Sequence, residues 1–507
     1  MPAPLRRFAR TAAAISLGLG LIACGAPDRA VSPTTALDGV SLAAAPAGVA
    51  SQSLGLRKAV SPSAIRTHQA AFQAIADQNG GLRSALDATH DAAVMYTRGQ
   101  LEAAGFNVTV QPFTFDYHGD LTLPVFTRVL PTPPLAYVHT VDFSTMSYSG
   151  NGDVTAEVRS VDVEIPSTGN STSGCEAADF AGFPAGAIAL VQRGTCMFRV
   201  KVENAMAAGA AAVIVMNEGN TPERQGALAG TINAPAVNIP VIGTSYAIGV
   251  SLASSVAAPF ARVRTHVANG LVSSSNLIAE SPGGDPNSVV VIGASIDSKF
   301  GPGINATSGA ATMIEIARAY ASQERLPNNR LRFIWFGAYA EGLEGSTYYV
   351  GNLTTDEKAR IKAMIELHAL GSPNFGRFIV DWDGLGFPPD AAVDAASNAL
   401  EAMFADYFGA IGLAASSKPG VTNALPFRNA GIPYSGLATG VGSAKTAEEA
   451  ALFGGTAGVA FDPCVFAACD SFSNVSLTAL DQMSDAAAHV VLMLSKRNFA
   501  QKPLAGN

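Results

Sequence analysis

The residues with the clearest chemical potential stand at the ends of apolar runs. The run VVVIGAS ends at Ser295, the run RLRFIWFGAY ends at Tyr339, and the segment IELH ends at His368. A serine hydroxyl beside an imidazole can act as a nucleophile with its general base. However, Ser295 lies in no G-x-S-x-G turn and no oxyanion hole is evident, so a metal-free serine hydrolase is only one alternative.

Residues 289–346 form one α/β unit that would position these groups. VVVIGASIDSKFGPGINATSGAATMIEIARAYA is typical of a buried strand, a Gly-rich turn and a helix, and RLRFIWFGAYAEGLEGS of a second buried strand. Strands this apolar belong to largely parallel sheets, whose ligands bind at the carboxyl ends of the strands. We therefore expect Ser295 and Tyr339 to open onto one edge of the sheet.

This unit resembles the secreted dizinc aminopeptidases related to aminopeptidase Y and to the Streptomyces and Vibrio leucyl enzymes. In that family the first strand ends in GAHxDS, the turn is GINDxGSG, and the second strand ends in GAEExGLxGS. A metal-ligand Asp precedes a Ser-Pro-Asn turn, and a final His lies near the C-terminus. The resemblance covers about residues 60–497. It implies an α/β fold in three layers, with helices on both faces of the sheet, as in the zinc exopeptidases.

All six of the family's metal and catalytic positions carry a different residue here. The family's general-base Glu falls on Tyr339, and its five metal ligands fall on Ser295, Ala306, Ala340, His368 and Phe466. A pair of zinc ions needs a bridging carboxylate and further anionic ligands, and only His368 is a usual zinc donor. A tyrosine cannot replace a carboxylate base at neutral pH. The resemblance then predicts no catalytic residue, no metal ligand and no cofactor.

These substitutions predict a pseudopeptidase, which is not an enzyme and binds a peptide or a protein. The alternative is an active metallo-aminopeptidase with a relocated or single-metal site that uses His368, Asp297, Glu341 and Glu344. Metal content would distinguish the two. The loop GPGINATSG lacks the spacing and the lysine of a phosphate-binding loop.

A second pattern interrupts the first between residues 145 and 268. The QRGTC turn, the Ala-rich helix and the AAVIVMN strand together resemble a strand-rich protease-associated domain. We expect it to be inserted between two parts of a peptidase-like domain, at 61–144 and 269–500. Residues 24–60 are rich in Ala, Ser, Pro and Gly and predict a flexible tether, because they cannot bury enough apolar area to fold.

Length and composition indicate a large globular protein. The chain has 507 residues, of which 48% are hydrophobic and 14% charged, so it can bury a large core in two or three domains. The net charge of −8 argues against nucleic acid or an anionic membrane surface as a partner.

The five cysteines and the N-terminus predict an exported protein. Cys175 with Cys196 and Cys464 with Cys469 would form two local disulfides, a pairing that also matches the family, although four free buried thiols are the alternative. Disulfides imply an oxidising compartment. Residues 1–23 have the length and charge of a signal peptide. The segment LIAC resembles a lipobox, so Cys24 would carry a lipid anchor to a bacterial membrane; ordinary cleavage nearby and secretion is the alternative.

Overall fold

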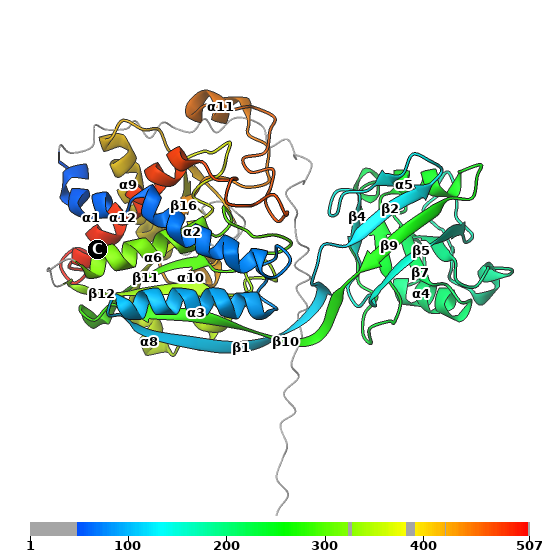
Figure 1. Ribbon diagram of the computed structural model, residues 1–507, viewed down its shortest axis with the longest axis horizontal. Helices are drawn as coiled ribbons and strands as arrows, with labels where there is room; N and C mark the ends of the chain where they lie inside the picture. The colour runs from blue at the N-terminus through cyan, green and yellow to red at the C-terminus, as the bar shows by residue number, and fades with distance from the viewer. Residues whose placement is uncertain (1–47, 323–326, 382–390, 421, 505–507) are drawn as a thin grey trace, which may run out of the picture.

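The structure, a computed structural model, describes residues 48–322, 327–381, 391–420 and 422–504 in two lobes joined by a ribbon of two strands (Figure 1). The larger lobe is built on an eight-stranded sheet. In spatial order its strands are β1 (Asn107–Asp120), β10 (Val267–Glu280), β12 (Asn329–Phe336), β11 (Asp285–Ser295), β13 (Ile361–His368), β16 (Tyr434–Ala438), β14 (Phe378–Val380) and β15 (Ser416–Lys418). The four strands β12, β11, β13 and β16 are parallel, and they are apolar because helices cover both of their faces.

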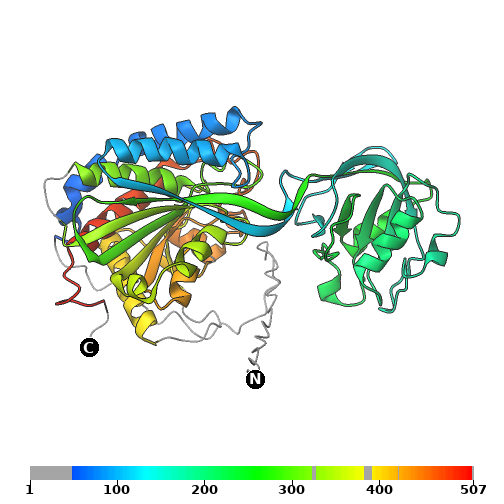
Figure 2. The ribbon, with the colours of Figure 1, turned by 90° about the horizontal axis from the view of Figure 1, so that it is seen from below.

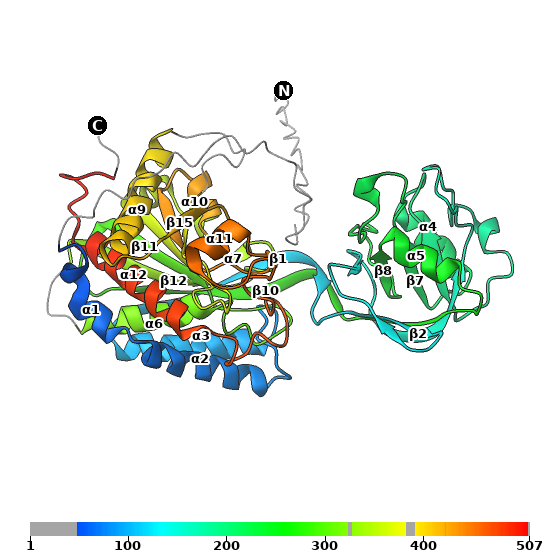
Figure 3. The same ribbon diagram turned by 90° about the horizontal axis from the view of Figure 1, so that it is seen from above.

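Helices pack on both faces of this sheet. On one face, the largest apolar cluster joins the sheet to α1 (Leu54–Ala59), α2 (Pro62–Asp77), α3 (Ala88–Ala103), α6 (Ser308–Ala321), α9 (Ala391–Ala410) and α12 (Leu477–Lys496). A second cluster joins the other face to α7 (Glu344–Gly351) and α10 (Leu425–Asn429). Figure 3 shows α12 beside α6 and α9, although these helices are far apart in the sequence. The short elements η1 (Ala50–Ser53), α8 (Thr355–Arg360) and α11 (Ala447–Phe453) complete the lobe. The expected three-layer α/β fold is confirmed.

The smaller lobe, which we call the insert, spans residues 125–265 and has its own sheet. In spatial order the strands are β3 (Leu135–Ala136), β2 (Val125–Leu130), β9 (Phe260–Thr265), β5 (Gly152–Ser160), β6 (Ile188–Gln192), β7 (Ala212–Met216), β8 (Val241–Thr244) and β4 (Phe143–Thr145). Two separate apolar clusters pack the helices α4 (Phe198–Ala207) and α5 (Tyr246–Ala253) against this sheet. Two short turns, η2 (Ala177–Phe180) and η3 (Pro222–Arg224), lie between strands. The insert therefore has a core of its own.

The ribbon that joins the lobes consists of β1 and β10. These strands pair antiparallel along their whole length, from Asn107 opposite Glu280 to Asp120 opposite Val267. Figure 2 shows the ribbon leaving the large sheet and running out to the insert. A loop of the insert reaches back across the junction, since the ring of His139 lies 5.6 Å from that of Phe300.

Two segments fold differently from the sequence-based expectation. Helical structure begins at Ala50, inside the predicted tether, because Leu56 and Val60 are buried in the core of the large lobe. The sheet of the insert begins at Val125, before residue 145, because β2 pairs with β9. The predicted signal peptide and Cys24 lie outside the described residues.

Both predicted disulfides are present. Cys175 is bonded to Cys196 in the insert, with Cα atoms 5.9 Å apart, and Cys464 to Cys469 in the large lobe, with Cα atoms 5.2 Å apart. The alternative of four free thiols therefore finds no support. Within the described ranges, no helix is both long enough and apolar enough to cross a membrane.

Candidate functional site

Strand register brings the predicted site residues to one edge of the large sheet. Ser295 ends β11 opposite Phe336 of β12, and His368 ends the neighbouring parallel strand β13. Tyr339 lies three residues beyond the end of β12, and the centre of its ring is 5.1 Å from that of His368. This is the carboxyl edge of the parallel strands, where ligands of open α/β sheets bind.

His368 is the most versatile group at this edge. Its Nδ1 atom is buried and has no hydrogen-bond partner among the described residues. Burial lowers the pKa of His368 to about 4. The imidazole is therefore neutral at pH 7, and a neutral imidazole can accept a proton or bind a metal ion.

Ser295 belongs to a buried polar chain and not to a nucleophile–base pair. Its Oγ accepts a hydrogen bond of 3.1 Å from Nδ2 of Asn423, and the same amide nitrogen donates to Oε1 of Glu366 at 3.0 Å. No hydrogen bond joins Ser295 to His368 in the described part of the chain. The geometry therefore gives no support to a serine hydrolase.

Sequence reasoning missed Glu366, which is fully buried. Burial raises the pKa of Glu366 to about 8, although hydrogen bonds from Asn423 act in the opposite direction. The carboxyl group is therefore mainly protonated at neutral pH. A lone acidic residue inside the apolar strand IKAMIELH was the signal that could have revealed it.

The remaining motif positions carry side chains without metal donors. Ala340 is 8% exposed, and Phe466 is 38% exposed in the loop closed by the Cys464–Cys469 disulfide. The methyl side chain of Ala306 cannot bind a metal ion, and its backbone N–H donates a hydrogen bond of 3.1 Å to Oδ2 of Asp470. Donation to Asp470 anchors the turn that precedes α6.

The acidic residues of the relocated-site hypothesis all have raised pKa values. Asp297 is 4% exposed, and burial, with the nearby charge of Glu341, raises the pKa of Asp297 well above its ordinary value. Burial also raises the pKa of Glu341 and of Glu344. Over residues 48–504, apart from the gaps in the described ranges, no group of three or more His, Cys, Asp or Glu side chains is placed to hold a metal ion. These acids therefore do not join His368 in a metal site.

Comparison with known families identifies both parts of the chain. The sequence pattern of peptidase family M28 matches residues 276–491. The pattern of the PA domain matches residues 154–252, which lie within the insert.

Curated relatives are similar over most of the chain. An aminopeptidase of Pseudomonas aeruginosa is 41% identical over 454 residues, which cover 87% of this chain and 82% of that protein. The probable leucine aminopeptidase 2 of Aspergillus fumigatus is 34% identical, over 69% of this chain and 68% of its own. The leupeptin-inactivating enzyme 1 of Streptomyces exfoliatus is 42% identical over 43% of this chain and 48% of its own.

Solved structures show the same architecture. An aminopeptidase from Aneurinibacillus sp. strain AM-1 covers 88% of this chain and 97% of its own, with a TM-score of 0.55 and 26% identity. A zinc aminopeptidase from Bacillus subtilis covers 87% and 96%, with a TM-score of 0.55; at 22% identity this likeness concerns the fold alone.

These comparisons correct two expectations that rested on the six substituted positions. We expected that the chain is not an enzyme, but 41% identity to an aminopeptidase over 87% of the chain points to an enzyme. We expected no cofactor, but membership of the matched peptidase family, the zinc aminopeptidase family that the motifs resemble, implies zinc. Both expectations are therefore wrong, and substitutions at motif positions were not sufficient ground for them.

The side chains at those six positions nevertheless do not fit a pair of zinc ions. Ser295, Ala306, Ala340 and Phe466 offer no imidazole, thiolate or carboxylate, which are the ligands that zinc takes in proteins. Only His368 is a usual donor, and Asp297, Glu341 and Glu344 form no metal-binding group with it in the described ranges. No chemical step can be assigned to zinc from these residues.

Fold, sequence and domain order agree on the relationship. The family pattern of the peptidase covers the parallel strands β11, β13 and β16, and the pattern of the PA domain lies in the lobe between β1 and β10. The extent of the match to the Pseudomonas aeruginosa aminopeptidase shows that the likeness is not confined to one lobe. The chain belongs to peptidase family M28 and carries a PA domain inserted into its peptidase domain.

Proposed function

We propose that the protein is an aminopeptidase that removes residues from the amino ends of peptides at the carboxyl edge of β11, β12 and β13. The observation that carries the proposal is the 41% identity to an aminopeptidase across both lobes. The catalytic groups at this edge differ from the family pattern, so the site works with a different set of side chains. An active aminopeptidase is thus preferred over an inactive binding protein, with His368, and not the acidic residues Asp297, Glu341 and Glu344, as the group that acts at this edge.

His368 is the group best placed to handle a proton in this site. Its imidazole is neutral at pH 7, since burial lowers its pKa to about 4, and its buried Nδ1 has no partner among the described residues. It can take a proton from a water molecule that attacks the peptide carbonyl. Tyr339 packs beside its ring, and the exposed Phe466 offers apolar surface to a peptide side chain.

The test is hydrolysis of leucine p-nitroanilide by the purified full-length protein and by a His368→Ala variant. Loss of a general base typically costs a factor of about 100 or more, so we expect kcat/KM to fall at least that far. His266→Ala is the matched control, because its side chain is exposed between β9 and β10. A folded wild-type protein with no hydrolysis above the His368→Ala level, with or without added zinc, would contradict the proposal.

Metal content tests the relocated site separately from activity. The protein is loaded with zinc, freed of loose metal and analysed for zinc per chain. If His368 is a ligand, His368→Ala loses the bound zinc and His266→Ala keeps it. Equal zinc content in the wild type, His368→Ala and His266→Ala would show that His368 is not a zinc ligand, whatever the hydrolysis assay shows.

We also propose that the protein is exported and that Cys24 anchors it to a membrane through a lipid. The two disulfides and the lipobox-like LIAC segment support this, and the net charge of −8 gives no reason to expect nucleic acid as a partner. In a bacterial host, labelled palmitate should enter the wild-type protein and not a Cys24→Ser variant. Equal labelling of the two would contradict lipidation at Cys24.

A further inference from the structure

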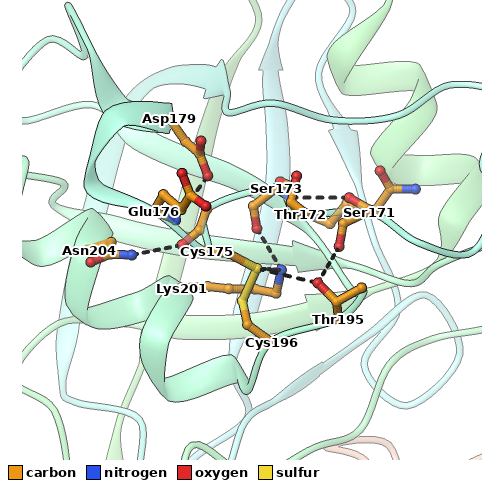
Figure 4. Close-up of a disulfide and its surroundings, with 12 residues drawn as sticks. Ser171, Thr172, Ser173, Cys175, Glu176, Asp179, Thr195, Cys196, Lys201 and Asn204 are labelled. Atoms are coloured by element: carbon orange, nitrogen blue, oxygen red, sulfur yellow. Dashed lines mark hydrogen bonds between the residues drawn. A yellow bond between two sulfur atoms is a disulfide. The ribbon is translucent and has the colours of Figure 1, made fainter.

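A buried lysine contacts the disulfide of the insert. Lys201 on α4 is fully buried, and its Nζ donates a hydrogen bond of 2.6 Å to the carbonyl oxygen of Ser173. The same Nζ lies 3.5 Å from Sγ of Cys175 (Figure 4). Oγ1 of Thr195 lies 3.9 Å from the same sulfur.

The ammonium group of Lys201 forms no salt bridge in the described part of the chain, since no carboxylate oxygen there lies within 4.0 Å of its Nζ. Burial lowers the pKa of Lys201 to about 8, while Asp179 and Asp162 act in the opposite direction from a greater distance. At pH 7 the side chain is therefore mainly an ammonium, and its neighbour is the neutral sulfur of a disulfide.

We propose that the Cys175–Cys196 disulfide is a thiol-exchange site for an external dithiol, in which Lys201 stabilises the thiolate of Cys175. Opening the bond converts the neutral sulfur beside the ammonium into an anion. A thiolate next to a lysine is stabilised, so the reduced form gains a charge pair that the oxidised form lacks. The proposal does not depend on the aminopeptidase function.

The chemistry runs in two balanced exchanges. A thiolate of the dithiol attacks Sγ of Cys196 and forms a mixed disulfide, while the Cys175–Cys196 bond breaks and its electron pair stays on Sγ of Cys175. The second thiolate of the dithiol then attacks the other dithiol sulfur, the one bonded to Cys196 in the mixed disulfide. This releases Cys196 as a thiolate. The dithiol is oxidised to a disulfide, and the protein disulfide is reduced by two electrons.

The second disulfide provides an internal contrast. The backbone N–H of Cys464 donates to Oδ1 of Asp462, and Cys469 is followed directly by Asp470. Acidic neighbours disfavour a thiolate, whereas the ammonium of Lys201 favours one. The bond between Cys175 and Cys196 should therefore be reduced more readily than the bond between Cys464 and Cys469.

The first experiment equilibrates the full-length protein in dithiothreitol redox buffers, blocks free thiols and maps both disulfides by mass spectrometry. We expect Lys201→Met to lower the equilibrium constant for reduction of Cys175–Cys196 about tenfold or more and to leave Cys464–Cys469 unchanged. Lys201→Arg, which keeps the positive charge, should retain most of the effect. A folded Lys201→Met protein with an unchanged constant would overturn the proposal.

A second measurement does not require replacement of the buried lysine. Cys196→Ser leaves Cys175 as a free thiol, and Cys175→Ser does the same for Cys196. The pH dependence of alkylation by iodoacetamide gives the pKa of each thiol, which is about 8.5 for an unperturbed cysteine. Cys175 should titrate at least one unit below Cys196, and equal or reversed values would overturn the proposal.

Discussion

At the scale of single residues, Glu366 shows how burial can set a protonation state without a charged partner. Its carboxyl group lies on a central strand, and within the described ranges the hydrogen bonds that favour its charged form come from the side chain and the backbone of Asn423. Burial raises its pKa to about 8, against 4.5 in an exposed glutamate. Between these two values the folded protein keeps a proton that the unfolded chain releases. Stability is therefore highest at low pH in this window and falls as the pH rises from 4.5 to 8.

We predict that Glu366→Gln makes the protein more stable at pH 8 and has little effect at pH 4. Glutamine keeps an acceptor oxygen for Asn423 but has no proton to lose. Each unit of pKa shift is worth about 1.4 kcal/mol at most, so a gain of a few kcal/mol is expected at pH 8. Urea unfolding at both pH values measures it. Glu102→Gln, at an exposed glutamate, is the control, and equal gains at both pH values would contradict the prediction.

The sequence predicted which residues meet at the sheet edge better than it predicted their partners. Ser295, Tyr339 and His368 could be placed there because each ends or follows an apolar strand. The hydrogen bond of Ser295 could not be predicted, since its partner Asn423 is 128 residues away in the sequence. The second acceptor of the Asn423 amide, Glu366, lies on another strand. Local pattern carries no information about such pairings. The same limit explains why substitutions at motif positions misled the prediction about catalysis.

At the scale of elements, one asparagine joins three loops of the large lobe. Asn305 is fully buried, and its amide nitrogen donates to Oδ2 of Asp462 at 2.6 Å and to Oγ of Ser372 at 3.0 Å. Its amide oxygen accepts from the backbone N–H of Gly371 at 2.9 Å. The turn before α6, the turn after β13 and the segment before the Cys464–Cys469 disulfide thus share one side chain.

We predict that Asn305→Ala destabilises the large lobe by about 3 kcal/mol. The substitution leaves a buried carboxylate, a hydroxyl and an N–H group without this partner, and each unsatisfied buried group costs about 1–3 kcal/mol before relaxation. Asn352→Ala is the control, because that amide makes an exposed bond to the carbonyl of Tyr348 and should cost less than about 1 kcal/mol. Equal free energies of unfolding for the two variants would show that Asn305 does not hold the loops together.

The order of elements in the centre of the fold was predictable because it follows from apolar runs and turn residues. The succession of β11, α6 and β12 agrees with the sequence from residue 289 to 336. The start of the fold was not predictable in the same way. Leu56 and Val60 are single apolar residues in a segment of low complexity, and only contact with the core of the large lobe makes them helical or buried.

At the scale of the whole molecule, the two lobes have separate cores and share the ribbon. The apolar clusters of the insert contain no residue of the large lobe, and the largest cluster of the large lobe contains none of the insert. Contacts across the junction include the ring contact of His139 with Phe300 and the 3.7 Å approach of Nε2 of His139 to Asp120. Each lobe therefore has its own source of stability.

We predict that the large lobe folds without the insert. Because Asp120 lies directly opposite Val267, an Asn-Gly turn in place of residues 121–266 would close β1 and β10 as a hairpin in their native register. The shortened protein should unfold in one cooperative transition and keep the near-ultraviolet circular dichroism of the large lobe. The control carries Pro-Pro in place of Asn-Gly, because proline cannot adopt the positive φ that a two-residue type I′ turn requires at both positions. That control should be markedly less stable. If both shortened proteins were equally unstable while the full chain folds, the insert would be part of the folding unit of the peptidase domain and not a separate domain.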